Sequence, residues 1–209
     1  EDIAEEKIHV TGNTVIDALF CLSDDAMNSA KEFYQDKNIP VDDNVVLITV
    51  HRRENHGERL DRILDAIETL VKKNSNHHFV LPVHPNPNVK DKVHCRLEKY
   101  SNVYLLKPLD YPYLVYLMKH AKLILTDSGG IQEEAPSFGC PTLVMRYETE
   151  RQEGINAGVS VLVGAEYDKI VSLSSEILDK TRQDSRLQAA NPYGKGDSAK
   201  IIEGLIREY

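Results

Sequence analysis

The sequence has 209 residues, of which 41% are hydrophobic and 28% are charged, and its formal net charge is −8. The length suits one large α/β domain or two small ones, and the apolar content is sufficient for a buried core. The acidic balance argues against nucleic acid as the main partner, because no basic excess is present to neutralise phosphate groups. A single nucleotide remains compatible with this charge, since it needs only a local positive site.

Cysteine, histidine and apolar patterns narrow the class further. The three cysteines are far apart without CxxC spacing, and the eight histidines show no HxxxH or HxH pattern, so neither a disulfide framework nor a metal site is indicated. No apolar run approaches the ~18 residues of a membrane span, and no signal peptide is visible. We therefore expect a cytoplasmic protein without a membrane partner. Because the chain begins with Glu1 rather than Met, we expect a fragment or a processed chain.

The first half of the chain alternates between helical and strand patterns. Residues 45–50 are apolar on both faces, which is typical of a parallel strand covered on both sides. Residues 58–73 repeat leucine and isoleucine at helical spacing. In chain order the sequence predicts a polar approach segment at 1–12 with a short strand at 8–10, a helix at about 14–35, a strand at 45–50, a helix at about 58–73, a strand at 79–83 and a helix at about 87–100.

The second half continues the alternation. It predicts strands at 103–106, 123–125, 142–145 and 159–163, and helices at 111–120, from 131 to about 140, at about 167–181 and at about 197–208. An alternation of strands and helices favours a parallel sheet with helices on both faces, which is a Rossmann-like α/β fold. We treat residues 1–209 as one domain.

Polar residues gather in the loops that follow the predicted strands. The carboxyl ends of parallel strands meet at one edge of a sheet, where α/β proteins bind their ligands. We therefore expect a ligand site built from the loops at 51–55, 84–86, 108–111, 127–130 and 146–151.

The turn Ser128-Gly129-Gly130 is the strongest candidate for an anion site. It joins a buried strand to a helix, and the first turn of a helix has unpaired N–H donors and a partial positive charge. Glycines let an anion approach the backbone closely. Glu134, one turn further, is placed to accept hydrogen bonds from sugar hydroxyls beside the phosphate. The alternative is that the two glycines only make a tight turn.

Other loops carry groups that suit acid–base chemistry or phosphate binding. Residues 51–55 offer an imidazole and two guanidinium groups, although a solvated charged loop is an equal alternative. His84 is also compatible with a loop histidine that bonds backbone, and the charged run at 146–153 with a salt-bridged loop. No G-x-G-x-x-G, Walker A or G-x-S-x-G motif is present, which leaves dinucleotide, P-loop and serine-hydrolase interpretations unsupported.

Six stretches of the chain resemble the bacterial-type, non-hydrolysing UDP-N-acetylglucosamine 2-epimerases. They follow the order of that family over almost the whole sequence, and together they resemble its C-terminal half. The stretches are VTGNTVIDAL (10–19), TVHRREN (49–55), PVHPNP (82–87), LTDSGGIQEEAPSFGCP (125–141), RYETERQE (146–153) and NPYGKGDSAKII (191–202).

The resemblance implies a fold and an activity. The fold is the two-domain arrangement of the GT-B glycosyltransferases, with the nucleotide sugar in the cleft between two Rossmann-like domains. The activity is the interconversion of UDP-N-acetylglucosamine and UDP-N-acetylmannosamine by elimination and re-addition of UDP, without cofactor or metal, in cell-surface polysaccharide biosynthesis. The resemblance also implies a homodimer, and a C-terminal helix at 197–209 that packs toward a missing N-terminal domain.

The resemblance assigns roles to several residues. Gly129, Gly130 and Ser128 match the phosphate-binding turn, and Glu134 matches the ribose-binding carboxylate. His51 matches the active-site histidine.

Further positions match binding sites of the family. Arg151 matches an arginine that contacts the nucleotide sugar, and Arg52 and His84 match positions of a site where a second substrate molecule binds as an activator. Leu109 and Leu114 stand where relatives can carry a glutamine and an aromatic residue near the uracil.

The proton-transferring carboxylates of the family belong to the N-terminal domain, which this sequence does not contain. Removal of a proton and its return need both a base and an acid, so we expect the chain to be inactive by itself. Two alternatives stay open at this point. One is a non-catalytic nucleotide-sugar-binding module, and the other is a glycosyltransferase domain of the same architecture.

Overall fold

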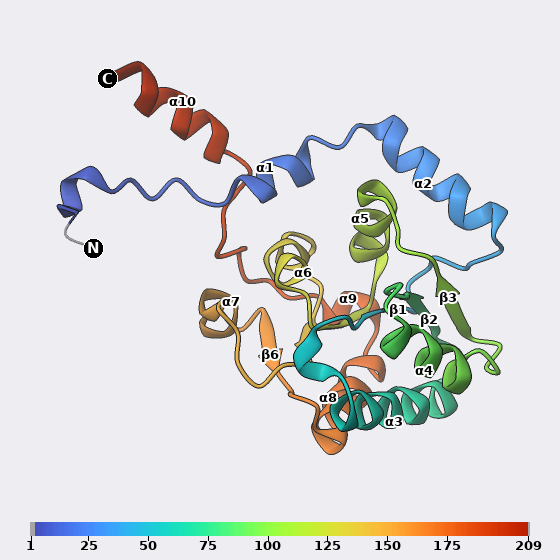
Figure 1. The fold of residues 1–209 in the computed structure, drawn as a ribbon. Coiled ribbons are helices and arrows are strands. Elements are labelled where there is room, and N and C mark those ends of the chain that lie inside the picture. Colours follow the sequence, from blue (N-terminus) through green and yellow to red (C-terminus); the bar gives the residue numbers. More distant parts are fainter. Residues whose placement is uncertain (1–2, 209) are drawn as a thin grey trace.

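A computed structural model describes residues 3–208, and its centre is one parallel sheet of six strands (Figure 1). Each neighbouring pair of strands in this sheet is parallel, and the strand order is β3-β2-β1-β4-β5-β6. The strands are β1 Val45–Thr49, β2 His78–Pro82, β3 Val103–Leu106, β4 Leu123–Thr126, β5 Thr142–Val144 and β6 Ser160–Leu162. The predicted Rossmann-like α/β fold is confirmed.

Helices connect the strands and cover both faces of the sheet. The α-helices are α1 Thr14–Phe20, α2 Asp24–Asp36, α3 Glu58–Lys73, α4 Pro87–Leu97, α5 Tyr111–His120, α6 Gly129–Glu134, α7 Gln152–Asn156, α8 Tyr167–Leu178, α9 Arg182–Ser185 and α10 Ser198–Glu208. Short 3₁₀ helices lie at η1 Glu5–Lys7, η2 Arg53–Asn55 and η3 Ala135–Phe138. Of the predicted approach segment and C-terminal helix, residues 1, 2 and 209 lie outside the described residues.

Strand β1 shows why the sequence is apolar on both faces. Alternate side chains of a strand point to opposite sides. Val46 and Ile48 belong to the hydrophobic cluster with α3, α4 and α8, whereas Val45 and Leu47 belong to the cluster with α2 and α5. All four side chains are buried, and the sheet is therefore enclosed between two apolar layers.

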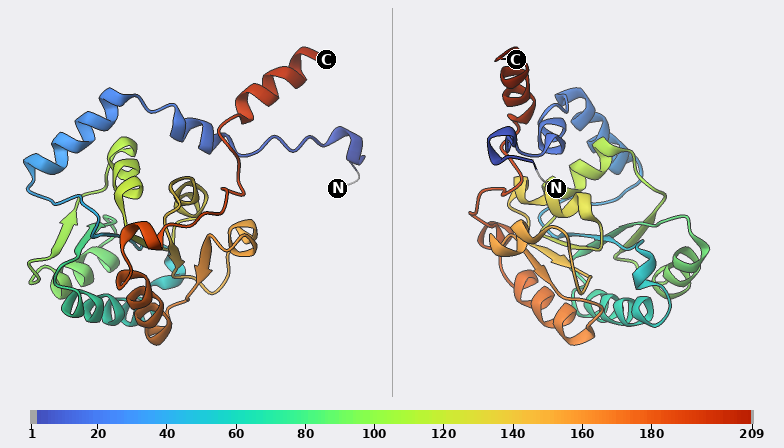
Figure 2. Two further views of the ribbon diagram at one scale, coloured as in Figure 1. Left: turned by 180° about the vertical axis from the view of Figure 1, so that it is seen from behind. Right: turned by 60° about the vertical axis from the view of Figure 1, so that its left-hand side comes forward.

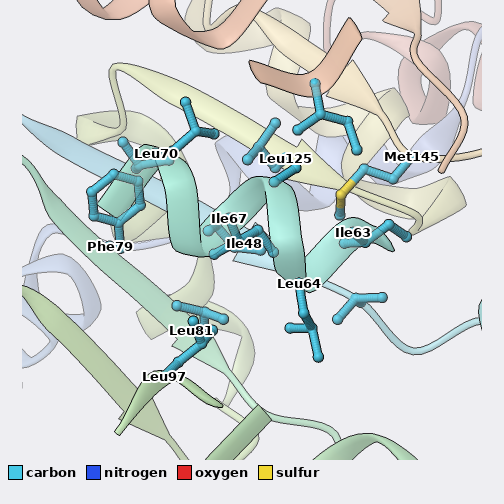
Figure 3. Close-up of a cluster of buried hydrophobic side chains, with 14 of the residues drawn as sticks. Ile48, Ile63, Leu64, Ile67, Leu70, Phe79, Leu81, Leu97, Leu125 and Met145 are labelled. Atoms are coloured by element: carbon cyan, nitrogen blue, oxygen red, sulfur yellow. The ribbon is translucent and has the colours of Figure 1, made fainter. Parts of the chain in front are cut away.

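Helix α3 forms the main cover of one face. Its apolar residues recur at helical spacing, and Figure 3 shows Ile63, Leu64, Ile67 and Leu70 packed with side chains of β1, β2 and β4. The observed limits of α3, Glu58–Lys73, are those that the sequence predicted.

The predicted helix at 14–35 is wrong in one respect, because the structure divides it into α1 and α2. Ser23 ends the interruption, and its hydroxyl accepts a hydrogen bond from the Ala26 N–H at 3.2 Å. A serine cap favours the start of a new helix over the continuation of an old one.

The strand expected at 8–10 is also not observed, since these residues carry no regular structure. Val10 is 93% exposed and pairs with no strand in the described chain.

Some helix limits also differ from the predicted ones. Helix α4 ends at Leu97, short of the predicted residue 100, and α8 ends at Leu178, short of 181. Helix α6 begins at Gly129 because the first turn is built from the two glycines. The short helices α7 and α9 were not predicted.

The two ends of the described chain project from the body of the molecule. Figure 2 shows the segment before α1 and the helix α10 extending away from the sheet and its covering helices. Helix α10 is attached at its start, where the Asp17 carboxylate accepts hydrogen bonds from the Ser198 and Ala199 N–H groups at 3.2 and 2.9 Å. Among residues 3–208, none of the helices combines the length and apolar character of a membrane crossing.

Candidate functional site

The sheet places its two central loops at a topological switch point. Strands β1 and β4 lie side by side, with Thr49 opposite Thr126, and the order then runs outward to β2 on one side and to β5 on the other. In open α/β sheets, the crevice between the loops that leave such a pair is where ligands bind. Here these loops begin at Val50 and Asp127.

Asp127 joins the two loops. Its side chain is fully buried, and its carboxylate accepts the His51 N–H at 3.0 Å and the Arg52 N–H at 2.9 Å. It also accepts the Asn55 side-chain amide at 3.0 Å and lies 2.9 Å from His51 Nδ1. Burial favours the neutral acid, but these donors outweigh burial and hold the pKa of Asp127 below its ordinary value.

A cavity of about 240 Å³ opens beside this pair of loops. The structure brings several of the predicted site residues together in its wall. The lining residues are Thr49, Val50, His51, Pro82, His84, Pro108, Leu109, Leu114, Ser128 and Ile131. Four of the five predicted loops contribute to this cavity, whereas the loop at 146–151 does not line it. Leu109 and Leu114 add apolar surface to the cavity wall.

His84 lies next to His51, with the ring centroids 5.9 Å apart and the rings stacked. Its Nδ1 accepts the Asn86 N–H at 3.2 Å, so the loop-histidine alternative describes this nitrogen correctly. Arg52, the other residue assigned to an activator site, contacts Asp127 through its backbone N–H. Its Nε is buried without a partner among the described residues.

The two glycines of the turn differ in their surroundings. A Cβ at Gly129 would lie 3.1 Å from the Cζ of Arg151, so the glycine lets the guanidinium rest against the backbone. A Cβ at Gly130 would meet nothing within 4 Å, and its φ angle is ordinary. The fold itself therefore gives no reason for glycine at 130, whereas close approach of a ligand would give one.

Arg151 is held in place from several sides. Its Nε donates to Glu133 at 2.8 Å, and the other oxygen of Glu133 accepts from Asn13 Nδ2 at 3.0 Å. The Tyr193 hydroxyl donates to the Arg151 carbonyl at 3.1 Å and accepts the Gly154 N–H at 3.0 Å. The guanidinium thus lies beside the turn with its orientation fixed.

Glu134 lies on the inner side of α6. It is buried, and its Oε1 accepts the Tyr111 hydroxyl at 2.9 Å. Burial raises the pKa of Glu134, and the Tyr111 hydrogen bond opposes that shift. Glu134 is not among the residues that line the cavity.

Arg146 belongs to the salt-bridged loop that was one alternative for this segment. Its side chain is buried, with Nε 2.6 Å from Glu54 and Nη1 2.9 Å from Glu150. The hydrogen bond that Arg146 donates is the main cause that lowers the pKa of Glu150 to about 2. Glu54 belongs to η2 and Glu150 to this loop, and Glu150 also lies 3.3 Å from Arg151 Nη1. Arg151 is the arginine of this segment that lies beside the turn.

Four residues that shape the site received no individual role from the sequence: Asp127, Asn55, Glu133 and Tyr193. Asp127 and Asn55 lie in loops that were expected to form the site, but the sequence assigned neither of them an individual role. Tyr193 lay in the matched stretch NPYGKG, to which no role was assigned. Within residues 3–208, no three His, Cys, Asp or Glu side chains are grouped as metal binding would require.

The strand order, the crevice at the switch point and the anion-compatible turn define a Rossmann-like domain of the nucleotide-binding class. A sequence profile described as UDP-N-acetylglucosamine 2-epimerase matches residues 1–207, and the chain belongs to this family.

Individual relatives agree with this assignment. The chain is 45% identical to the UDP-N-acetylglucosamine 2-epimerase of Yersinia pestis over 214 aligned positions, which cover 100% of the chain and 57% of the relative. The crystal structure of the Neisseria meningitidis enzyme bound to UDP-GlcNAc superimposes with a TM-score of 0.85 at 40% identity, over 99% of this chain and 57% of that one. The chain thus spans little more than half the length of these relatives and corresponds to their C-terminal part.

The fold extends beyond the family. The glycosyltransferase WaaG, which is involved in lipopolysaccharide biosynthesis, superimposes with a TM-score of 0.57 at 18% identity, over 84% of this chain and 50% of that one. This likeness concerns the fold, which is that of a C-terminal GT-B domain.

Proposed function

We propose that the chain is the UDP-binding half of a UDP-N-acetylglucosamine 2-epimerase, which interconverts UDP-N-acetylglucosamine and UDP-N-acetylmannosamine. The observation that carries the proposal is the unobstructed backbone at Gly130 beside the fixed guanidinium of Arg151. Open N–H groups and a guanidinium are the donors that a leaving diphosphate requires. The Neisseria meningitidis relative, whose structure contains UDP-GlcNAc, supports the choice of ligand.

The proposed placement uses the cavity and the turn together. The diphosphate lies over Ser128 and Gly130, within reach of Arg151. The ribose hydroxyls donate hydrogen bonds to the carboxylate of Glu134, which also accepts the Tyr111 hydroxyl. The uracil lies toward the apolar wall of Leu109 and Leu114, and His51 faces the sugar.

The chemistry requires groups that the described residues do not bring to the cavity. Proton removal and return at C2 need a base and an acid on opposite faces of the sugar, and His51 alone does not serve both. We propose that the chain is inactive by itself and is completed by an N-terminal domain that supplies carboxylates. By resemblance to the family, we extend this proposal to a cytoplasmic homodimer that acts in polysaccharide biosynthesis. We likewise extend it to an activator site at Arg52 and His84.

A glycine substitution tests the phosphate site. Gly130→Val fills the open space above the turn, and we expect the affinity for UDP to fall at least 10-fold in isothermal titration calorimetry, because the anion loses its approach to the backbone. Gly204→Ala is the matched control, since its Cβ also meets nothing within 4 Å but lies on α10. Unchanged UDP affinity in Gly130→Val would refute the proposed site.

The activity is tested by proton NMR of UDP-N-acetylglucosamine in D₂O with this chain at high concentration. We expect no deuterium at C2, together with broadened uridine and ribose signals. Deuterium incorporation with appearance of the manno epimer would show that a second domain is not required.

A further inference from the structure

The Asp127 carboxylate is the most heavily hydrogen-bonded group at the crevice. It is fully buried, and it faces the His51 ring, whose side chain is 37% exposed. His51 Nδ1 lies 2.9 Å from Asp127 Oδ1, and the two backbone N–H groups of His51 and Arg52 donate to the same carboxylate. With this many donors around it the group is ionised and acts only as an acceptor.

An acceptor-only carboxylate fixes the hydrogen of its imidazole partner. Nδ1 of His51 must carry a hydrogen to bond Asp127, so the neutral ring has its lone pair on Nε2. Nε2 lies on the other side of the ring from Asp127, and the ring lines the cavity. We propose that Asp127 is a positioning residue, which holds His51 in the Nδ1–H tautomer and leaves Nε2 as a hydrogen-bond acceptor for the substrate.

Asn55 secures this arrangement from behind. Its Nδ2 donates to Asp127 at 3.0 Å and to the Met145 carbonyl at 3.0 Å, and the residue is buried. Asn55 therefore ties the loop after β1 to the ends of both β4 and β5. The carboxylate cannot turn away from His51 without breaking these contacts, and this rigidity is what a positioning role requires.

His84 has the opposite hydrogen-bonding character. Because its Nδ1 accepts the Asn86 N–H, the neutral ring carries its hydrogen on Nε2. The two stacked rings, 5.9 Å apart, thus give the cavity wall one acceptor and one donor. A sugar hydroxyl, which both donates and accepts, matches this pair.

The tautomers are measurable without any substrate. The inference rests on the proposed function for the ligand that meets Nε2, but ¹⁵N–¹H correlation spectra of the histidine rings of the free chain test it independently. At pH 8 we expect His51 to show the Nδ1–H pattern and His84, the internal reference, the Nε2–H pattern. A wild-type spectrum with the His51 hydrogen on Nε2 would overturn the inference, whatever the result of the UDP titrations.

Asp127→Asn is the decisive variant. Its amide can donate to His51 Nδ1, so we expect the His51 ring to switch to the Nε2–H pattern while His84 stays unchanged. Thr142→Val is the control for a disturbed sheet, because buried Thr142 lies at the opposite end of β5 from this crevice. A His51 pattern that is the same in wild type and Asp127→Asn would show that Asp127 has only a structural role.

The same variant separates positioning from binding in the two-domain protein. We expect kcat to fall about 100-fold or more, because the acceptor on Nε2 is lost, with KM changed less than threefold. A rise in KM with unchanged kcat would contradict the inference, since it would assign Asp127 to substrate binding.

Discussion

The two glycines of the DSGG turn show why single residues must be judged by their neighbours. Gly129 is covered by the Arg151 guanidinium, and Gly130 is open. A side chain at position 129 would have two effects, because it would displace Arg151 and would also obstruct the turn. Loss of binding in a Gly129 variant would therefore have two explanations, whereas a Gly130 variant has one.

Glu134 carries a prediction at the same scale. Glu134→Ala should weaken UDP binding by about 1–3 kcal/mol, through lost charge-assisted hydrogen bonds to the ribose, and should weaken pyrophosphate binding much less. Titration calorimetry with both ligands measures the difference. Tyr111→Phe is the matched control, because it removes the other partner of the carboxylate and leaves the carboxylate itself in place. Equal losses for UDP and pyrophosphate in Glu134→Ala would rule out the ribose role.

Among the secondary-structure elements, those with a strong internal pattern were predicted well. Helix α3 has an uninterrupted apolar stripe, and its limits agree with the prediction. The break between α1 and α2 depends on the Ser23 cap, which competes with a continuous helical pattern and was overlooked. Residues 8–10 have the composition of a strand, but a strand needs a neighbour, and the sequence gives no information on whether one is within reach.

At the amino-terminal ends of the strands, a buried polar contact makes the stability of the fold depend on pH. His77 precedes β2 and Lys122 precedes β4, and Lys122 Nζ donates to the Leu178 carbonyl at 2.7 Å and lies 3.2 Å from His77 Nε2. Burial, followed by the charge of Lys122, lowers the pKa of His77 to about 4. His77 is therefore neutral in the folded chain.

A depressed histidine pKa lowers stability in acid. Between the ordinary value of about 6.5 and the folded value, the unfolded chain takes up a proton that the folded chain does not. Because of His77, the free energy of unfolding should thus fall by up to ~3 kcal/mol as the pH drops from about 6.5 to about 4. Urea unfolding of His77→Asn across this range should show a smaller loss than wild type, and exposed His9→Asn should behave like wild type. Equal pH slopes in all three chains would contradict the assignment.

For the molecule as a whole, exposed apolar residues concentrate on the projecting parts. Val10 and Ile8 lie on the segment before α1, and Ile201 and Ile206 lie on α10, with Ile206 70% exposed. Figure 2 shows these parts standing off from the body. We propose that they pack against the N-terminal half of the two-domain protein, as the resemblance implied for the C-terminal helix.

Ile206→Glu tests this docking. In the isolated chain an exposed position changes stability by less than about 0.5 kcal/mol, so the thermal midpoint should stay constant. In the two-domain protein the buried charge should lower the midpoint measurably by calorimetry. Lys200→Glu, an exposed change on the same helix, provides the control. Equal midpoints for Ile206→Glu and wild type in the two-domain protein would contradict the proposed contact.

The sequence predicted those site residues whose own side chain or backbone suits the ligand. It did not predict residues that act by positioning another residue. The sequence singled out His51, Ser128 and Gly130 because each belongs to a loop after a strand. It placed Asp127 in one of these loops without a role of its own and gave none to Glu133, because the importance of both depends on contacts with His51 and Arg151. Such contacts join residues far apart in the chain, and only the assembled sheet brings them together.

The network around Arg151 also orders events in time. The Asn13 N–H donates to the Tyr193 carbonyl at 2.8 Å, and the Tyr193 hydroxyl holds the Arg151 carbonyl. Ribosomal synthesis releases the amino-terminal part first, so the sheet and the DSGG turn leave the ribosome before the tyrosine does. The arginine receives its final support only when residue 193 is free to fold back. A nascent chain can therefore complete this anion site only after residue 193 has followed the sheet out of the ribosome.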